Sequence, residues 1–375
     1  MFSLRPYMPP DFSQECFTDA PEAVFLSAPA DGVAPDNYHA MSIFPEYVKR
    51  KGKWLLPRES RMDCVAVLEG EELVIREFRK IRRGDRILVG RGEKCEEGIY
   101  MHTEGFQARN QEEEAFSFRR NRSRETAQTR DYQELAGLLM HERDHGKAVW
   151  VMGPAFTFDH DAREAMSWLI RNGFVHSVLA GNALATHDLE AAWLGTALGQ
   201  DIHTHVSRAH GHYNHLDTLN RVRKWGSVPA FIRGEGIDNG IIYSCEACHV
   251  PYVLAGSIRD DGPLPCVFGD VYEAQDRMRE ELRGATTVIC MATALHTIAT
   301  GNMTPSYRVM KDGSIRQVFF YSVDVSEFAV NKLADRGSLG ARGIVTNAQD
   351  FVVRLRQNLS REIAGSDTAQ RKEKS

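Results

Sequence analysis

The chain has 375 residues, of which 42% are hydrophobic and 26% are charged, a composition typical of a soluble globular protein long enough for two domains. Its 46 Lys and Arg residues are outnumbered by 51 Asp and Glu residues, so no basic field favours a nucleic-acid partner. No apolar run approaches the roughly 18 residues of a membrane helix, and the first residues lack the basic start and apolar core of a secretory signal. We therefore expect a cytoplasmic protein without membrane contact, whose seven cysteines are reduced.

The first part of the chain is predicted to be a small β domain. Residues 1–25, rich in Pro, Asp, Glu and Phe, are expected to form an irregular lead. Between residues 26 and 106 the apolar residues follow a strand-like period that Gly, Glu and Asp turns interrupt. The clearest strands cover residues 64–69, 73–78, 85–90 and 98–103. Short strands at such close spacing predict a β-barrel-like domain or a sandwich.

Residues 107–130 are nearly all charged or polar and are predicted to be a linker. Mixed charge without periodicity is typical of a solvated segment that does not pack. The alternative is that its arginines face an anionic ligand. These arginines are Arg119, Arg120, Arg122 and Arg124.

From residue 131 to about 365 the chain alternates between helical and strand-like patterns, and residues 366–375 are expected to be a disordered tail. Six apolar strands are predicted, at residues 147–153, 175–181, 251–255, 286–293, 317–325 and 342–346. Strands separated by helices specify a mostly parallel sheet with helices on both faces. The fold class is therefore α/β, with a Rossmann-like domain after the small β domain.

Several of these strands end in a glycine or another small residue that a polar residue follows. The carboxyl ends of parallel strands meet at one edge of the sheet, where a nucleotide cofactor commonly binds. The candidate cofactor-binding residues are Gly181, Asn182, Gly256, Ser257, Thr293, Gly301, Asn302, Met303 and Asp324. Asn182 could instead serve only a turn, and Asp324 could accept from a ribose hydroxyl or cap the next helix. No G-x-G-x-x-G fingerprint follows any strand, so a dinucleotide would be held in a non-standard way.

The stretch 251–270 has the pattern of a functional loop. A short apolar strand stops at Gly256, and four polar residues follow within five positions. These are Ser257, Arg259, Asp260 and Asp261. Gly262, Pro263 and Pro265 then restrict the conformation of the loop. The alternative is a solvated connection that happens to be charged.

Histidines and cysteines suggest two further sites. A His-rich loop holds His203, His205, His210, His212 and His215. No acidic residue or cysteine completes a recognisable metal-ligand spacing there, so we expect no metal and a substrate-facing or surface loop. Residues 245–249 match C-x-x-C-H, but a haem is not expected in a chain without an export signal. Cys245 remains a candidate for lining the site.

Four long motifs together resemble one family. They are LAGNALATHDLEAAWLGTALG at 179–199, YSCEACHVPYVLAGSIRDDGPLPCVFGDVYEAQDRMRE at 243–280, ATALHTIATGNMTPS at 292–306, and VDVSEFAVNKLADRG with GIVTN at 323–347. The chain is similar here to the archaeal-type ornithine cyclodeaminases, the LOR/SDH-related family, and to the carboxyl-terminal half of the cyanobacterial arginine dihydrolase fusion enzyme. The match extends upstream through ESRMDC at 59–64 and APADGVAPDNY at 28–38. We expect the domain that precedes this region in the family to be absent here.

The resemblance implies a homo-oligomeric enzyme with bound NAD. In the family, the substrate is oxidised at Cα, its δ-amine attacks with loss of ammonia, and the hydride returns, so that ornithine becomes proline. Such chemistry needs an acid/base, for which Asp260 or Asp261 is the candidate, and a group for the α-carboxylate, for which Arg259 is the candidate. A mutual ion pair of Arg259 with Asp260 is the alternative. An amino-acid or opine-type dehydrogenase with net redox change and a non-catalytic NAD-binding protein also stay open.

The chain departs from the family in three places that we predict to face the substrate. It has residues 43–46, IFPE, where the family reads N-H-P-T; residues 116–125, FSFRRNRSRE, where it reads F-G-F-M-S-S-x-V-S-S-E; and residues 153–160, GPAFTFDH, where it reads G-P-A-V-V-H-T-G. The substrate-side candidates are Asn37, Arg120, His160 and His212. Retained cofactor motifs with changed substrate loops favour NAD chemistry on an altered substrate.

Overall fold

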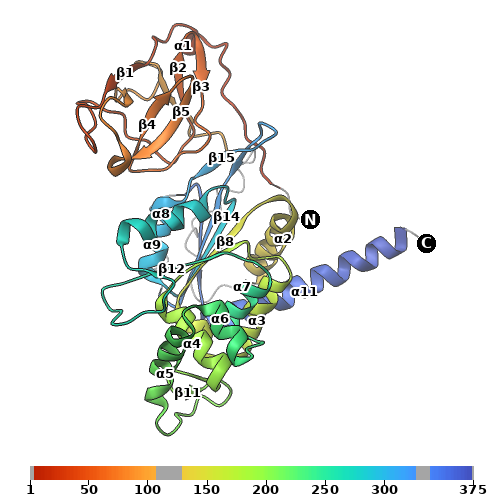
Figure 1. The fold of residues 1–375 in the computed structure, drawn as a ribbon. Helices are drawn as coiled ribbons and strands as arrows, with labels where there is room; N and C mark the ends of the chain where they lie inside the picture. Colours follow the sequence, from red (N-terminus) through yellow and green to blue (C-terminus); the bar gives the residue numbers. More distant parts are fainter. Residues whose placement is uncertain (1–3, 107–128, 327–337, 374–375) are drawn as a thin grey trace.

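The computed structural model describes residues 4–106, 129–326 and 338–373. These residues form a small β domain and a larger α/β domain, which lie at opposite ends of the molecule with β15 between them (Figure 1). No helix in these three ranges is long and apolar enough to cross a membrane.

The β domain consists of two antiparallel sheets. The larger has the order β1-β6-β4-β5, with β1 at Val24–Ser27, β6 at Arg86–Val89, β4 at Cys64–Glu69 and β5 at Glu72–Glu77. The smaller has the order β3-β2-β7, with β3 at Lys53–Leu55, β2 at Glu46–Arg50 and β7 at Ile99–Met101. The prediction of a small β domain is therefore confirmed. The barrel-like closure is wrong, because within residues 4–106 the outer strands of each sheet pair on one side only.

The lead before this domain is irregular apart from the single turn α1 at Glu15–Thr18. It is nevertheless anchored, because the buried Lys49 ammonium donates to the carbonyl oxygens of Phe17, Thr18 and Ala20 at 3.0, 2.8 and 2.7 Å. An ammonium group has three protons to donate, so these three acceptors satisfy it.

The α/β domain is built on a seven-stranded sheet whose pairs are all parallel. Its order is β13-β12-β9-β8-β14-β17-β18, with β13 at Val267–Phe268, β12 at Tyr252–Ala255, β9 at Ser177–Gly181, β8 at Ala148–Met152, β14 at Thr287–Met291, β17 at Phe319–Asp324 and β18 at Gly340–Val345. The predicted parallel sheet and its six strands are confirmed. The prediction missed β13, since two residues carry no periodicity.

Helices cover both faces of this sheet (Figure 1). One face packs against α2 at Thr129–His145, α3 at His160–Arg171 and α11 at Ala348–Glu373, and the other against α8 at Val271–Leu282 and α9 at Ala294–Met303. Four more helices follow β9, namely α4 at Asn182–Leu194, α5 at Asn214–Trp225, α6 at Val228–Glu235 and α7 at Ile241–Ala247. Helix α11 continues through residues 366–373, where we had predicted a disordered tail.

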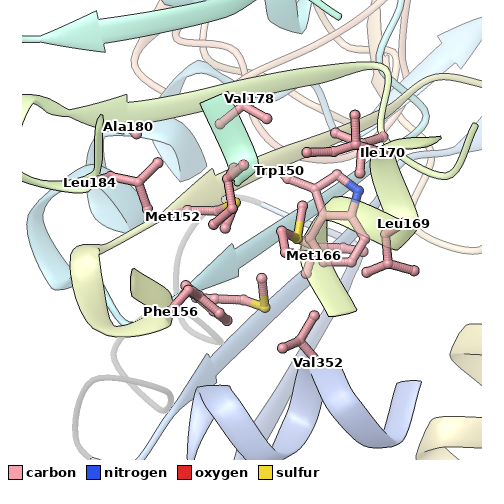
Figure 2. Packing of buried hydrophobic residues seen from close by; sticks show 14 of the residues in the cluster. Trp150, Met152, Phe156, Met166, Leu169, Ile170, Val178, Ala180, Leu184 and Val352 are labelled. Carbon is pink, nitrogen blue, oxygen red and sulfur yellow. The ribbon is translucent and has the colours of Figure 1, made fainter. Parts of the chain in front are cut away.

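The core shows why alternate residues of a central strand face different helices. Trp150 and Met152 of β8 pack with Met166 and Leu169 of α3 and with Val352 of α11 (Figure 2). Val149 and Val151 of the same strand belong to the core on the opposite face. The indole N–H of Trp150 donates to the Phe174 carbonyl at 2.9 Å, so its burial leaves no polar group unpaired.

The β domain attaches at the amino edge of the sheet, where the parallel strands begin. The hairpin of β15 (Tyr307–Val309) and β16 (Ile315–Gln317) leads into β17. Next to it, the Ser306 amide donates to the Ser60 carbonyl at 2.9 Å, and the Val309 amide donates to the Arg58 carbonyl at 2.8 Å. The carboxyl edge, where the strands end, therefore lies away from the β domain.

Candidate functional site

The strand order reverses direction at β8. From β8 the chain builds β9, β12 and β13 outward on one side, and then returns to build β14, β17 and β18 on the other. In open parallel sheets, ligands bind at such a switch point beyond the carboxyl ends of the strands. The end of β8, between the ends of β9 and β14, is therefore the place to examine first.

Two helices start beside this point without a side-chain cap. Helix α4 follows β9 with Gly181 as its N-cap residue, and α9 follows β14 with Thr293, and neither receives a cap hydrogen bond from that residue within the described chain. By contrast, Asp159 caps α3 and Asp270 caps α8 with their carboxylates. The free N–H groups and the positive dipole ends of α4 and α9 thus remain available for an anion such as a phosphate.

Glycines at the strand ends let the backbone segments approach closely. A Cβ on Gly153 would lie 1.9 Å from the Ala292 carbonyl oxygen, and one on Gly256 would lie 2.8 Å from the Phe268 carbonyl oxygen. A Cβ on Gly181 would lie 3.1 Å from Cε1 of His296. Only glycine fits the first two positions, and at Gly181 a larger residue would displace the histidine.

The loop that follows β12 is tied to the end of β9. The Asn182 carbonyl oxygen Oδ1 accepts from the Leu264 amide at 3.0 Å and from the Thr186 hydroxyl at 3.2 Å. Within the loop, the Ser257 amide donates to Asp260 Oδ2 at 2.8 Å. The structure therefore brings the predicted residues Gly181, Asn182, Ser257 and Asp260 to one edge.

His296 belongs to this group, although it was not among the residues predicted from the sequence. It lies in the first turn of α9, half-buried beside Gly181. Burial lowers the pKa of its imidazole, and the charge of Asp260 raises it by a smaller amount. A neutral imidazole near a carboxylate is suited to accepting a proton at neutral pH. The signal that could have found it is its position three residues after Thr293 at a strand end.

The two other charged loop residues are more exposed. Asp261 and Arg259 both face solvent, whereas Asp260 is half-buried. The Arg259 amide donates to the Ser257 hydroxyl at 3.2 Å. No ion pair joins Arg259 to Asp260 among the residues that the structure describes, so that alternative finds no support.

Three residues predicted to bind a cofactor lie elsewhere. We expected Gly301, Asn302 and Met303 to form a corner after the helix ALHTIAT, but they form the last turn of that helix, α9. A helix of this length carries its end about 15 Å from its start, and Met303 lines a cavity next to the β domain. We therefore leave these three residues out of the proposed cofactor site.

Cys245 and Asn37 also lie away from the carboxyl edge. Cys245 is fully buried in the core beneath α3 and α4, where desolvation raises the pKa of its thiol well above the usual range. A buried apolar thiol packs and is inert. Asn37 belongs to the β domain, where its carbonyl accepts from the Gly90 amide at 2.9 Å. Within one chain neither residue joins the group around Gly181.

The remaining candidates have mixed positions. Asp324 ends β17 at the carboxyl edge, and its carboxylate accepts from the Ser326 amide at 2.8 Å. His160 begins α3 with its ring 4.3 Å from that of His203. His212 is exposed and stacks on its neighbour Tyr213. Arg120 lies outside the described residues.

Metal ligation finds no support in the described residues, because no group of three or more His, Cys, Asp or Glu side chains there could hold an ion. In the His-rich loop His203, His205, His210 and His212 are exposed, whereas His215 is half-buried with its ring 6.1 Å from that of His187.

Of the two departures from the family that the structure describes, one lies at the carboxyl edge. Residues 153–160 follow β8 there, with Phe156 buried and His160 half-buried. Residues 43–46 lie in the β domain, where Glu46 is buried against His39. The prediction that they face the substrate is therefore not supported within one chain. Residues 116–125 fall outside the described ranges.

The strand order, the uncapped helix starts and the strand-end glycines define a nucleotide-binding α/β protein of the Rossmann class. Residues 133–355 match the family model described as arginine dihydrolase ArgZ-like, C-terminal, Rossmann fold. The chain belongs to this family, which includes the archaeal ornithine cyclodeaminases.

Individual relatives give the same result. The ornithine cyclodeaminase of Methanopyrus kandleri is 39% identical over 345 residues, which cover 89% of this chain and 77% of that protein. The bifunctional arginine dihydrolase/ornithine cyclodeaminase ArgZ of Synechocystis is 34% identical, over 90% of this chain and 47% of that protein.

Solved structures agree with the fold. A LOR/SDH protein from Methanococcus maripaludis S2 superposes with a TM-score of 0.80 at 32% identity, covering 91% of this chain and 99% of that one. The ternary complex of AgrE with ornithine and NAD⁺ superposes with a TM-score of 0.58 at 31% identity, covering 92% of this chain and 47% of that one.

Proposed function

We propose that this enzyme uses NAD to convert ornithine, or a closely related diamino acid, into a cyclic amino acid with release of ammonia. The observation that carries the proposal is the arrangement at the switch point: two uncapped helix starts flank the end of β8, and His296 lies there between Gly181 and the loop of Asp260. The relatives named ornithine cyclodeaminase and the ornithine and NAD⁺ complex of AgrE support the substrate and the cofactor.

The residues at the carboxyl edge fit a dinucleotide. We assign the phosphates to the starts of α4 and α9, with Gly181, Asn182 and Thr293 around them. Gly256 and Ser257 lie on the β12 side, and Asp324 on the β17 side is the candidate for a ribose hydroxyl. NAD, when bound, supplies the reversible oxidation of the substrate at Cα.

Large apolar side chains exposed at the same edge are also consistent with a bound dinucleotide and substrate. Ile258, Leu295 and Val325 follow β12, β14 and β17 and expose 106%, 72% and 59% of their surface. They are spread along the carboxyl edge, where ligands of open parallel sheets bind. We assign them to covering the flat rings of the cofactor or the carbon chain of the substrate.

The chain's own groups would move the protons. Oxidation at Cα requires the α-ammonium to lose a proton, and the departing α-nitrogen later needs protons to leave as ammonia. We assign this exchange to His296, which burial keeps neutral, with Asp260 orienting it by charge. Arg259, on the same loop, is the candidate for holding the substrate carboxylate.

Labelled ornithine tests the proposal. The purified chain is incubated with NAD⁺ and ornithine that carries ¹⁵N at the α-amine and deuterium at Cα. We expect ¹⁵N in the ammonia, unlabelled nitrogen in proline, deuterium retained at the proline Cα, and no net NADH. Retention of ¹⁵N in proline would refute this route, because the δ-nitrogen would then have left.

Two other outcomes separate the alternatives. Accumulating NADH with a keto product indicates a dehydrogenase with net redox change. Binding of NAD⁺ without turnover of ornithine, lysine or 2,4-diaminobutyrate indicates a non-catalytic protein. Lysine and 2,4-diaminobutyrate differ from ornithine by one methylene group each, so they report the length of chain that the site admits.

A further inference from the structure

A cavity lies at the amino edge of the sheet, opposite the proposed cofactor site and between the two domains. Its volume is about 660 Å³, and residues of the β domain, of α8 and of the segment before β15 line it. This volume falls within the roughly 300–1,000 Å³ range of small-molecule sites. We call it the interdomain cavity.

The interdomain cavity is strongly basic. Its lining includes seven Arg or Lys side chains and four Asp or Glu side chains, an excess of three positive charges in a chain whose overall charge is −5. Such a local field attracts small anions.

The acidic side chains of the lining are already paired. Glu77 lies 2.7 Å from Arg61 NH1 and 2.6 Å from Arg279 Nε, and Glu59 lies 3.0 Å from Arg308 NH1. Asp276 of α8 pairs with Arg79 and with Lys80, so the contact also joins the two domains. Three basic side chains of the lining have no acidic partner within it: Arg76 pairs with Glu69 and Asp85, Arg82 pairs with the exposed Asp31 at 3.4 Å, and Arg283 forms no ion pair among the described residues.

The guanidinium groups of the lining are crowded around Arg61, which is 8% exposed and pairs with Glu77. Burial lowers the pKa of Arg279 and Arg308; the charges of Glu77 and Glu59 oppose this shift, and the charge of Arg61 adds to it, a crowding that an anion would relieve.

The lining of the cavity also includes residues of a motif that has no role in the carboxyl-edge site. The segment ESRMDC at 59–64, part of the family resemblance, contributes Glu59 and Arg61 to the lining. It lies on the β domain, away from the proposed cofactor site.

We propose that the interdomain cavity binds a small molecule that carries a phosphate group. A phosphate carries roughly two negative charges and three strong acceptor oxygens, and arginine forks match this geometry in a bidentate way. The cavity is larger than one phosphate needs, so the rest of the ligand has room beside it. This proposal does not depend on the proposed reaction.

Titration calorimetry with inorganic phosphate and with pyrophosphate tests the proposed anion site. Chloride keeps the ionic strength constant, and NAD⁺ is present in excess. The test variant is Arg82→Gln/Arg283→Gln, since both side chains line the cavity and are exposed enough to be replaced without unfolding the chain. The control is Lys224→Gln/Arg277→Gln, which removes the same charge from exposed positions outside the lining.

We expect saturable binding of pyrophosphate to the wild type and to the control, and binding about tenfold weaker or more in the test variant. Equal weakening in both double variants would mean general charge attraction and would overturn the proposal. Pyrophosphate binding that does not saturate, or that is lost when NAD⁺ is added, would also overturn the proposal. A chain that failed to bind NAD⁺ would still give the comparison between the two variants.

Discussion

His39 and Glu46 form a buried pair in the β domain, with His39 Nε2 2.5 Å from Glu46 Oε2. The other ring nitrogen, Nδ1, lies 3.1 Å from the Gly90 carbonyl oxygen, so both nitrogens face acceptors and both can donate only in the charged ring. Burial lowers the pKa of His39, but the hydrogen bond to Glu46 and its charge outweigh burial, so that the pKa is raised. Glu46 stands in one of the segments that depart from the family.

The pair predicts a pH-dependent stability. Because the folded-state pKa of His39 is above the unfolded value of about 6.5, its stabilisation is complete below that pH and is lost as the pH rises through the folded pKa. Glu46→Gln should lower the free energy of unfolding by about 3 kcal/mol at pH 6. The gap to the wild type, measured by urea unfolding, should narrow toward higher pH. A constant gap would contradict the assignment, and Glu71→Gln, at an exposed ion pair, is the control.

Gly153→Ala and Gly181→Ala should have different effects on stability and on turnover. Gly153→Ala places a Cβ against the backbone oxygen of Ala292, which cannot yield, and should destabilise the fold by about 3 kcal/mol. Gly181→Ala meets the ring of His296, which can move, so we expect a stability change below about 1 kcal/mol together with a loss of turnover. Thermal unfolding and kcat measured on both variants separate the two effects. Equal stability loss in both would show that the His296 ring is fixed.

Asn182 is predicted to serve both the loop and the cofactor. Asn182→Asp keeps an oxygen for the Leu264 amide and the Thr186 hydroxyl, and adds a negative charge at the start of α4. The variant should keep its thermal stability but bind NAD⁺ about tenfold more weakly or worse, because the charge repels the phosphates. Asn182→Ala should lower both the thermal stability and the affinity for NAD⁺. Unchanged NAD⁺ affinity in Asn182→Asp would remove α4 from the phosphate site.

The proton-transfer assignment predicts a pH profile. If neutral His296 is the base, kcat rises with pH through its lowered pKa, below about 6.5. Asp260→Asn removes the charge that raises this pKa, so the acid limb should move to lower pH. His296→Gln should lose the limb and about 100-fold in kcat.

Asp261→Asn is the matched control for Asp260→Asn, since Asp261 is exposed one residue away. It should leave the acid limb in place. If Asp261→Asn abolishes turnover while Asp260→Asn retains it, the assignment belongs to Asp261 instead.

Cys245 is predicted to be inert. Because burial raises the pKa of its thiol, it should resist alkylation in the folded chain, whereas the exposed Cys16, Cys248 and Cys266 react. Cys245→Ala should retain kcat and lose about 1 kcal/mol of stability through the small void it leaves. Peptide mapping after iodoacetamide treatment checks the first point. A large fall in kcat at unchanged stability would contradict the second.

Much of the α/β domain could be predicted from the sequence because buried parallel strands are short apolar runs bounded by glycine and helical patterns. The ends of β9 and β12 were placed to the residue for this reason, and with them Gly181 and Gly256. Two-residue strands such as β13 have no such signal. The closure of the β domain could not be predicted, because it depends on which edges pair over long distances.

The candidate site was only partly predictable. Residues at or just after a strand end, such as Asn182 and Thr293, could be placed at the carboxyl edge because their position relative to the sheet is local information. His296 was missed because it owes its place to a contact with Gly181, more than a hundred residues away. Residues 301–303 were misplaced because α9 continues through them and carries them away from the end of β14.

The reversal of strand order at β8 has a consequence for substitutions beside it. The segment 153–160 lies next to the uncapped starts of α4 and α9 but belongs to neither helix. Gly153 and the buried Phe156 hold that segment in place, so only its half-buried positions, such as Ala155 and His160, can be exchanged at little cost to the fold. Exchanges there alter the surface beside the end of β8 without altering the starts of α4 and α9.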